Sequence, residues 1–390
     1  MRVVHIGFRY GLCNAGGAAI AATRLHLALL NRGIESHYIC VHKLEDGPNI
    51  HVLPNGGILR WLYLALTKLS RGIWRLSKFR RPISINVVTL YGLERLLREL
   101  QPDVVHVHWI NADVCTFEQL AKLPYRMVFN LHDLFWIKGP FLSPGDNGGV
   151  TALGKLLSRR RRKLIEEKRP TFVGPSEWVC SVARGSEACK GCNVIKISNL
   201  VDSAYSYREG LRHPHKKFTM LFGAFGGRGN AFKGWADCEK SLKLLPEDVR
   251  ENAVLNIVGE SALDYEIDGL KVHFLGAINE PESLVAIYHN SDILLFPSLQ
   301  ETQGMMKVEA LLCGVPVVAF NRAACAESVE NGVNGWVADD GNIESFAKGI
   351  VHFYSLWCCG AISNKIISDA ATNEFSTPST VENTLLAYWR

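Results

Sequence analysis

Short apolar runs alternate with longer segments of helical periodicity in the first half of the chain. The runs that we interpret as strands are Val3–Gly7, Ser36–Val41, Val104–His108, Arg126–Leu131, Thr171–Gly174 and Val194–Ile197. Strands that are apolar on both faces are typical of parallel sheets, because connecting helices cover the two faces of such sheets. The alternation therefore predicts βαβ units and a parallel sheet.

The same pattern begins again in the second half of the chain. Its strand candidates are Phe218–Phe222, Val254–Val258, Val272–Leu275, Ile293–Phe296 and Val315–Ala319. The polar segment Asp202–Lys217 separates the two series and is expected to be a linker. We predict an α/β chain with two Rossmann-like, doubly wound domains at residues 1–201 and 218–375, and a final helix at 376–390 that packs back toward the first domain. In such sheets ligands bind outside the carboxyl ends of the strands, so the active site is expected in the cleft between the domains.

Composition agrees with a globular chain of this size. Of the 390 residues, 47% are hydrophobic and 21% are charged, which argues against disorder. Apolar runs stay well short of the roughly 18 residues of a membrane-spanning helix. The first residues, Met1–Gly7, are too soon interrupted by polar residues to resemble a signal peptide, so we expect a cytoplasmic protein.

Eleven cysteines are scattered along the chain, and we expect most of them to be buried thiols. The closest pair with metal-ligand spacing is Cys189 and Cys192, with Cys180 nearby. A structural zinc site needs four ligands and no second pair follows, so we expect no metal there.

Positive charge is concentrated in two segments. Residues 56–82 carry seven Lys or Arg and no acid, and residues 155–169 carry eight Lys or Arg against two Glu. On a helical projection of residues 58–81 one face is basic and the opposite face is apolar; the basic face holds Arg60, Lys68, Arg71, Arg75 and Lys78, and the apolar face Leu62, Leu69, Ile73 and Leu76.

This predicted amphipathic helix has two interpretations. With Trp61 and Trp74 it is suited to an anionic membrane surface, and the run Arg159–Lys163 could extend that surface. Alternatively, it is an ordinary helix that packs its apolar face on the core and leaves its basic face in solvent. No nucleic-acid recognition motif accompanies the charge, so nucleic acid is not an expected partner.

Gly16 and Gly17 follow the first predicted strand and begin a helix that continues to Leu30. Glycines at a helix start let a ligand approach the backbone, and the free N–H groups there favour a phosphate. A tight turn with no ligand is the alternative.

The most informative stretch is residues 292–337. A buried strand leads into Pro297-Ser298 and a loop that holds Glu301; a helix then begins near Gly304 and carries Glu309. Carboxylates suit sugar hydroxyls, because each oxygen accepts hydrogen bonds. Two solvated acids on a helix face would not explain this strand–loop–helix–strand setting.

This stretch resembles the retaining GT-B glycosyltransferases, in the large bacterial group that builds capsule, O-antigen, lipopolysaccharide and exopolysaccharide. Their signature is Pro-Ser-x-x-Glu, seven residues, a second Glu on a helix, and then Cys-Gly-x-Pro-Val, which matches residues 297–317. The resemblance extends to Asn199–Asp202, Leu255–Gly259 and Val272–Gly276. The segments His108-Trp109 and His132-Asp133 resemble a subgroup that is related to colanic-acid transferases.

The resemblance implies roles for individual residues in the second domain. Glu309 would hold the ribose of a nucleotide-diphosphate sugar, and Glu301 would hold the hydroxyls of the transferred sugar. Arg228 and Lys233 would bind the donor diphosphate and offset the charge that develops as it leaves. Gly304 would belong to the same donor site, where this chain has Gln303-Gly304 in place of the family's Phe-Gly.

In the first domain, the resemblance places His132 near the anomeric centre and makes Gly16 and Gly17 the phosphate-side glycine loop. His132 could instead be a structural histidine at a strand end. The segment after His132-Asp133 departs from the subgroup, since Phe135–Pro140 replaces its usual cysteine-containing stretch. The chain contains no Asp-x-Asp, the motif through which many such enzymes hold a metal, so we expect neither a metal nor another cofactor.

The resemblance implies a retaining glycosyltransferase that is peripheral to the inner face of the cell membrane. It would move a sugar from a nucleotide-diphosphate donor to a saccharide or lipid-linked saccharide of a bacterial polysaccharide pathway. The acceptor would attack on the face from which the diphosphate departs, and a leaving phosphate oxygen would take the proton. A nucleotide-sugar 2-epimerase of the same fold and a non-catalytic assembly subunit are the alternatives.

Overall fold

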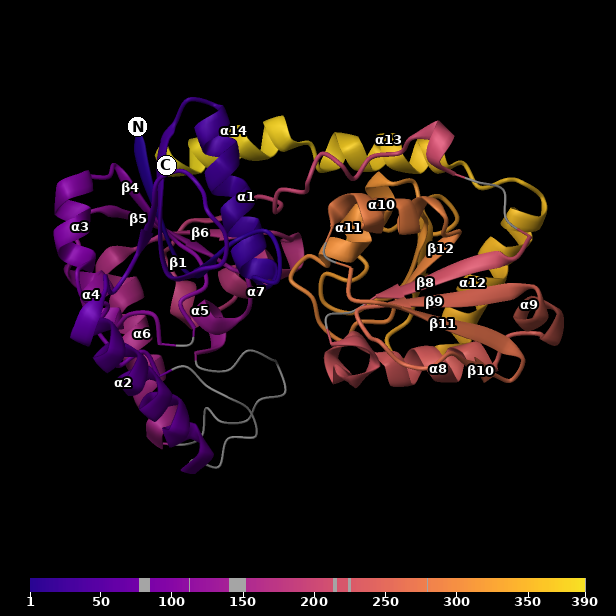
Figure 1. The fold of residues 1–390 in the computed structure, drawn as a ribbon, viewed down its shortest axis with the longest axis horizontal. Helices are drawn as coiled ribbons and strands as arrows, with labels where there is room; N and C mark the ends of the chain where they lie inside the picture. The colour runs from indigo at the N-terminus through magenta and orange to yellow at the C-terminus, as the bar shows by residue number, and fades with distance from the viewer. Residues whose placement is uncertain are drawn as a thin grey trace. The chain divides into compact units, whose positions relative to one another are not determined.

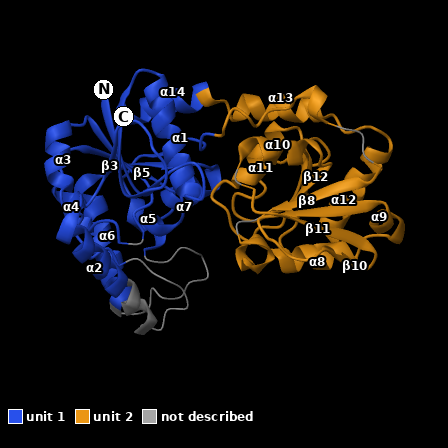
Figure 2. Ribbon diagram, in the orientation of Figure 1, with its two compact units in different colours: residues 1–200, 378–390 blue, residues 201–377 orange. Residues whose placement is uncertain are grey.

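The computed structural model describes residues 1–76, 85–111, 113–139, 152–212, 216–223, 226–278 and 280–389. The chain forms two compact units, which Figure 2 distinguishes by colour. Unit 1 consists of residues 1–200 and 378–390, and unit 2 consists of residues 201–377.

Unit 1 is built on a sheet of seven parallel strands in the order β3-β2-β1-β4-β5-β6-β7. The strands are β1 (Arg2–Tyr10), β2 (Glu35–Lys43), β3 (Ile50–Val52), β4 (Val104–Val107), β5 (Arg126–Asn130), β6 (Thr171–Gly174) and β7 (Val194–Lys196). Its helices are α1 (Gly17–Asn31), α2 (Gly57–Leu76), α3 (Leu93–Leu100), α4 (Phe117–Lys122), α5 (Phe135–Lys138), α6 (Ala152–Lys168), α7 (Glu177–Arg184) and α14 (Thr377–Trp389). The strand order reverses between β1 and β4, as in other doubly wound sheets.

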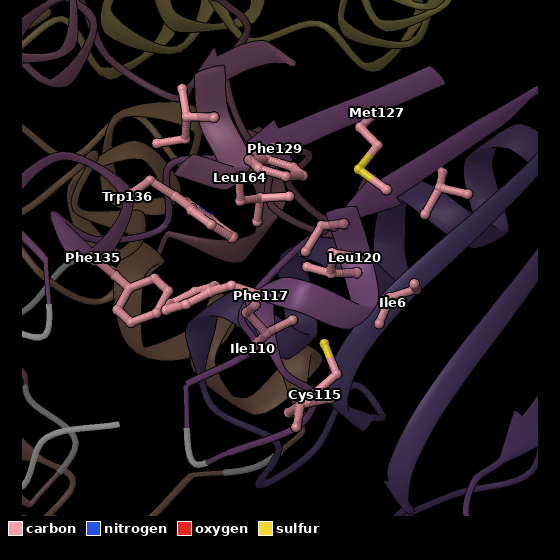
Figure 3. Packing of buried hydrophobic residues seen from close by; sticks show 14 of the residues in the cluster. Ile6, Ile110, Cys115, Phe117, Leu120, Met127, Phe129, Phe135, Trp136 and Leu164 are labelled. Atoms are coloured by element: carbon pink, nitrogen blue, oxygen red, sulfur yellow. The ribbon is translucent and has the colours of Figure 1, made fainter. Parts of the chain in front are cut away.

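Apolar side chains fill both faces of this sheet. One core, shown in Figure 3, includes the stacked rings of Phe129 and Trp136, whose centroids lie 4.2 Å apart. The core on the other face joins Val3 and Val104 to Leu25 of α1 and Tyr388 of α14. The last helix of the chain is therefore part of the core of unit 1.

Unit 2 repeats the architecture with the strand order β10-β11-β9-β8-β12-β13-β14. The strands are β8 (Phe218–Gly223), β9 (Ala253–Val258), β10 (Tyr265–Ile267), β11 (Leu270–Gly276), β12 (Ile293–Phe296), β13 (Val317–Phe320) and β14 (Gly335–Ala338). The helices are α8 (Trp235–Lys243), α9 (Glu247–Glu251), α10 (Pro281–His289), α11 (Met305–Leu312), α12 (Ile343–Cys358) and α13 (Asn364–Glu374). All strand pairs are parallel except β10 with β11. The neighbouring strands β8, β9 and β11 lie side by side in Figure 1.

These two sheets confirm the predicted fold class. All of the strand candidates lie on strands of the structure, but the sequence analysis missed three short strands, β3, β10 and β14. The segment expected to be a linker is largely packed into unit 2, since Tyr205 lies in its core and Arg212 forms an ion pair with the buried Asp292. Within that segment, residues 213–215 lie outside the described residues.

The predicted basic helix corresponds to α2, and the side of it that faces unit 1 carries polar rather than purely apolar side chains. The side that packs on unit 1 holds Tyr63, Thr67 and Ser70, and the Tyr63 hydroxyl donates to the carbonyls of Asp113 and Val114 at 3.0 and 2.9 Å. An exposed apolar strip consists of Ile58, Leu59, Trp61, Leu62 and Leu69. The alternative interpretation, in which the apolar face with Leu62 and Leu69 packs on the core, was therefore wrong.

Lys68 is exposed as predicted, but three other basic side chains of the two basic segments differ from the prediction. Arg60 turns back, and its guanidinium donates to the carbonyls of Pro54 and Val41 at 3.4 and 3.3 Å. In the second basic run, Arg160 binds Glu118 at 2.6 Å and the buried Arg161 donates to the Phe135 carbonyl at 2.7 Å. Lys78 and the side chains of Arg71 and Arg75 lie outside the described residues. Among the helices that the structure describes, none combines the length and apolarity needed to span a bilayer.

Candidate functional site

In unit 2 the candidate residues gather where β12 ends and α11 begins. All residues of β12 are buried, and the loop that follows turns into α11 at Gly304. Gly304 has φ = +80°, and a Cβ atom there would lie 2.6 Å from the ring of Phe296. Only glycine allows this turn, which places Glu301 in the loop immediately before the helix.

Lys233 is held beside Glu301 by contacts between their two loops. The Lys233 ammonium donates to Glu301 Oε1 at 2.6 Å, and both side chains are largely buried. The backbone N–H of Leu299 donates to the Phe232 carbonyl at 2.8 Å. At Gly234, with φ = +70°, a Cβ atom would lie 1.9 Å from the Pro297 carbonyl oxygen, so glycine is required for this close approach. The structure thus brings together the residues predicted to bind the diphosphate and the sugar.

Arg228 is engaged by a residue that the sequence analysis missed. Its guanidinium donates to Glu260 at 2.9 and 3.1 Å, and the backbone N–H of Arg228 donates to the same carboxylate at 2.9 Å. These hydrogen bonds hold the pKa of Glu260 below its usual range. The Arg228 cation also lies 4.6 Å from the ring centroid of Phe274 and 5.2 Å from that of Tyr265. Glu260 lies two residues after Val258, the last residue of β9. A charged residue just beyond the carboxyl end of a predicted strand was the signal that could have identified it.

Glu309 lies on α11 and is only 7% exposed. The Tyr288 hydroxyl of α10 donates to Glu309 Oε2 at 3.2 Å. Burial, and secondarily the nearby Glu309 carboxylate, raises the pKa of Tyr288, which therefore stays a hydrogen-bond donor. The two carboxylates thus have different partners, since Glu301 binds a lysine and Glu309 a tyrosine.

A second residue that the sequence analysis missed is Lys307. Its ammonium is buried and donates to the carbonyls of Ala324 and Glu327 at 2.7 and 2.6 Å. Burial lowers the pKa of Lys307 to about 8. These bonds tie α11 to the loop after β13, which itself contacts the Glu301 backbone through the N–H of Ala324 at 3.3 Å. The available signal was the position of Lys307 between two methionines and the segment Val308–Leu312, in which Glu309 is the one other charged residue.

In unit 1, Gly16 and Gly17 line a cavity of about 360 Å³ together with Phe8, His108 and Trp109. The helix α1 begins at Gly17, and Gly16 adopts φ = +88°. Neither glycine has a neighbour that a Cβ atom would meet within 4 Å, so the backbone N–H groups at this helix start border open space. Such groups attract anions.

Trp109 and the segment His132-Asp133 are fixed to one another next to this cavity. The partly buried Asp133 carboxylate accepts from the Trp109 indole N–H at 2.9 Å and from the Asn111 amide at 2.9 Å. Burial raises the pKa of Asp133, although these donors and the Phe135 N–H oppose the shift.

The partly buried His132 contacts a cluster of buried histidines. Its Nε2 lies 3.1 Å from Nδ1 of His108, and Nε2 of His108 lies 2.9 Å from Nδ1 of His5. His106 contacts the Tyr388 hydroxyl through Nδ1 at 2.8 Å. Burial lowers the pKa of His132 to about 3, so its imidazole is neutral at physiological pH.

The same cluster is the candidate metal centre of the described part of the chain. Ligand atoms of His5, His106 and His108 lie within 4.8 Å of one another. However, both ring nitrogens of His108 already have imidazole partners, so an ion would have to displace at least one of them. Cys189 is buried and Cys192 is partly buried, and neither belongs to a metal-binding group among the described residues.

Each of the two units matches a known family of glycosyltransferases. Residues 206–372 match the family model "Glycosyl transferases group 1", and residues 15–204 match "Glycosyltransferase Family 4". The chain belongs to the group 1 glycosyltransferases. In this glycosyltransferase the first match contains Arg228, Lys233, Glu301 and Glu309, and the second contains Gly16, Gly17 and His132.

Curated relatives support the assignment of the transferase. It is 35% identical to a 41.2 kDa protein in the cps region of Klebsiella pneumoniae, over 91% of this chain and 92% of that protein. It is 30% identical to the glycosyltransferase MJ1607 of Methanocaldococcus jannaschii, over 65% of this chain and 67% of that one.

Solved structures with the same GT-B fold resemble the transferase over nearly its whole length. Sucrose-phosphate synthase of Thermosynechococcus elongatus gives a TM-score of 0.72 at 16% identity, covering 99% of this chain and 98% of that one. Anabaena Alr3699/HepE in complex with UDP and glucose gives 0.62 at 17% identity, with the same coverage. WaaG, a glycosyltransferase involved in lipopolysaccharide biosynthesis, gives 0.61 at 15% identity, covering 98% of each chain.

Proposed function

We propose that this glycosyltransferase moves a sugar from a nucleotide-diphosphate donor with retention of anomeric configuration. The observation that carries the proposal is the Lys233–Glu301 ion pair at the start of α11. It places a cation suited to a diphosphate directly beside a carboxylate suited to sugar hydroxyls. The UDP and glucose bound by Alr3699/HepE support a donor of this class.

In this proposal the residues of unit 2 hold the donor. Glu309 accepts hydrogen bonds from the ribose, and Glu301 accepts them from the transferred sugar. Lys233 turns from Glu301 toward the diphosphate and offsets its growing charge, while Arg228, fixed by Glu260, adds a second cation. Gly304 gives the donor access to the N-terminal end of α11.

Unit 1 contributes the groups that the resemblance assigns to the acceptor side. Gly16 and Gly17 present backbone N–H groups to a phosphate, and His132 contacts the sugar near its anomeric carbon. The acceptor hydroxyl attacks on the face that the diphosphate leaves, and a departing phosphate oxygen takes its proton. No side chain is then needed as a base.

The experiment supplies a panel of α-linked nucleotide sugars with a saccharide acceptor and determines the product anomer by NMR spectroscopy. We expect an α-linked product, whereas a β-linked product would contradict retention. Donor incubated alone separates the alternatives, because an epimerase converts it to an epimer and a non-catalytic subunit leaves it unchanged.

We further propose that catalysis needs no metal ion, since Lys233 and Arg228 supply the positive charge at the diphosphate. Transfer measured after removal of divalent ions with EDTA is expected to keep its full rate. Loss of activity with EDTA and its recovery with Mg²⁺ would contradict this part of the proposal.

The acceptor is proposed to be a lipid-linked intermediate of a bacterial surface polysaccharide, such as capsule, O-antigen or exopolysaccharide. The cps-region relative from Klebsiella pneumoniae and the likeness to WaaG support this pathway class. The exposed apolar strip of α2 supports a place on the cytoplasmic face of the membrane. In this strip the side chains of Ile58, Trp61 and Leu69 are 83%, 72% and 67% exposed. Exposed apolar side chains on a helix beside basic residues are typical of helices that lie in a bilayer interface.

A further inference from the structure

The cavity of unit 1 lies where β1 and β4 end and α1 begins. Its volume of about 360 Å³ falls within the roughly 300–1,000 Å³ of small-molecule sites. The strand order reverses between β1 and β4, and ligands of doubly wound sheets bind at such a point. Of the residues that line this cavity, only Gly16 and Gly17 have a role in the proposed function. The other lining residues indicate which kind of ligand it suits.

Small residues and aromatic rings make up most of the lining. The segment Ala15–Ala19 holds no side chain larger than a methyl group, so it leaves room for a ligand. Phe8 and Trp109 come from the ends of two neighbouring strands, and their ring centroids lie 5.9 Å apart at an angle of 61°. Aromatic rings attract the C–H groups of a sugar, because the ring faces carry negative charge. The lining therefore suits a saccharide.

Arg9 is the one charged side chain among the described residues that line the cavity. The other arginine of β1, Arg2, lies 2.6 Å from the Glu35 carboxylate, whereas Arg9 has no such ion pair within the described part of the chain. The guanidinium of Arg9 lies 5.4 Å from the ring centroid of Phe8, beside the aromatic part of the lining. The cavity thus offers a positive charge that no acid of its lining offsets.

The other polar side chains of the lining already have partners. The Tyr38 hydroxyl donates to the Arg9 carbonyl at 3.0 Å, and the Trp109 indole N–H donates to Asp133 at 2.9 Å. Both ring nitrogens of His108 contact other imidazoles, and burial lowers the pKa of His108, so this ring is neutral. The side chain of the lining that is left to bind a polar group of a ligand is Arg9.

We propose that this cavity binds the acceptor through an acidic sugar unit, whose ring packs on Phe8 and Trp109 and whose acid pairs with Arg9. The acid is a carboxylate, as in a uronic acid, or a phosphate on the sugar. The planar guanidinium matches either anion, because two of its N–H groups can donate in parallel. Arg9 is then a specificity residue that takes no part in the transfer step. This inference rests on the proposed function, since it assigns the acceptor of that reaction to the cavity.

The test measures sugar binding to the full-length protein without a donor, through the indole ¹⁵N–¹H resonance of Trp109 in NMR titrations. The probes are methyl glucuronide, glucose 1-phosphate, neutral methyl glucoside and inorganic phosphate. The tighter of the two acidic sugars should bind at least about tenfold more tightly than methyl glucoside, because hydrogen bonds to charged groups are worth that factor or more. That sugar also identifies the acid as a carboxylate or a phosphate.

Two outcomes of these titrations would overturn the proposal. If methyl glucoside binds as tightly as both acidic sugars, negative charge is not recognised. If inorganic phosphate binds as tightly as the tighter acidic sugar, the sugar ring is not recognised.

Variants then test the individual contacts. Arg9→Gln should weaken binding of the tighter acidic sugar by at least about tenfold and leave methyl glucoside nearly unchanged. The matched control is Arg95→Gln, which removes the same charge from an exposed site on α3 outside the cavity and should have no effect. Phe8→Leu keeps an apolar side chain but removes the ring, so it should weaken acidic and neutral sugars alike. Equal binding to the two arginine variants, or wild-type binding by Phe8→Leu, would contradict the assigned contacts.

UDP distinguishes the acceptor from the donor as the source of the anion. Its Kd for Arg9→Gln, measured by calorimetric titration, should equal that of the wild type, because the proposed donor site is in unit 2. A loss of UDP affinity as large as that of the acidic sugar would assign Arg9 to the donor phosphates and overturn the proposal. Failure of the proposed transfer reaction would leave the sugar titrations unaffected, and failure of acidic-sugar binding would leave the test of the product anomer unaffected.

Discussion

At the scale of single residues, the Lys233–Glu301 ion pair means that, in the proposed donor site, a diphosphate would have to compete with a carboxylate for the same ammonium group. The two atoms lie 2.6 Å apart and are mostly shielded from solvent. Removing one partner of such a pair leaves the other charge uncompensated, so simple truncation would combine two effects. Lys233 is therefore best compared with a residue that is proposed to bind the donor and that forms no ion pair among the contacts described above.

Glu309 provides this comparison. Glu309→Gln keeps an oxygen for the Tyr288 hydroxyl but removes the charge that the ribose hydroxyls would bind. We expect donor binding to weaken by about 1.5–3 kcal/mol, or roughly 10- to 150-fold in Kd, as measured by calorimetric titration. Lys233→Met should instead lower kcat more than it weakens binding, because the charge that it meets grows in the transition state. Wild-type kinetics for both variants would refute these donor roles.

Lys307 gives a prediction about stability. Its folded-state pKa of about 8 is below the ordinary lysine value of 10.5, so between these pH values the unfolded chain binds a proton that the folded chain does not. Stability from this group therefore increases as the pH rises from about 8 to 10.5, by about 3 kcal/mol. The measurement is the difference between urea-unfolding free energies of the wild type and Lys307→Met across this range; a flat difference would show that the ammonium is not desolvated.

At the scale of secondary-structure elements, α2 is distinguished by the polarity of the side that it buries. Tyr63, Thr67 and Ser70 face the protein while Ile58, Trp61 and Leu69 face outward. Such an exposed apolar strip is typical of a surface that binds another apolar surface. The interface of a lipid bilayer, in which apolar side chains can be buried, is the partner that we propose.

The membrane proposal predicts the effect of changing this strip. Replacing Trp61, Leu62 and Leu69 with Ser should lower binding to anionic vesicles at least tenfold in a sedimentation assay, because each buried large apolar side chain contributes about 1.5–3 kcal/mol. A matched triple change of the exposed Leu263, Val333 and Ile366 of unit 2 should have no effect. Equal sedimentation of the two triple variants would contradict membrane docking by α2.

Elements with a strong local pattern could be predicted from the sequence. Continuous apolar runs marked strands such as β1 and β12, and the turn at Gly304 could be inferred from its place between strand and helix. The strands β10 and β14 are short; β10 has a glutamate at its centre, and β14 begins with a glycine after a polar loop. The environment of Arg228 and the contact between His5 and His108 could not be predicted, because the partners come from segments about 30 to 100 positions apart, which only the sheet order brings together.

At the scale of the whole molecule, the histidines concentrate pH sensitivity in unit 1. Burial lowers the pKa of His26 to about 4 and that of His106 and His132 to about 3, and it also lowers those of His5 and His108. Since the unfolded chain protonates these rings near pH 6.5 and the folded chain does not, acidification favours unfolding.

Unit 1 is therefore expected to lose stability as the pH falls from about 6.5 to 4, by about 1.4 kcal/mol per pH unit for each such histidine. Limited proteolysis with pepsin, followed by mass spectrometry, should give first cleavages within residues 1–200 at pH 5. In unit 2, His289 is the one described histidine whose pKa burial lowers, so residues 201–377 should be cut later. First cleavage in unit 2 would contradict the prediction.

The return of the last helix to unit 1 has a consequence for how the chain is made. The Tyr388 hydroxyl lies 2.8 Å from Nδ1 of His106, although 282 positions separate the two residues. A ribosome that adds about 5–20 residues per second needs roughly 10–40 s to pass from the end of β7 to Tyr388. During that interval the nascent first unit exposes the apolar surface of Val3 and Val104 that α14 later covers. Unit 2 (residues 201–377) is therefore synthesised completely before unit 1, which still lacks residues 378–390 at that point.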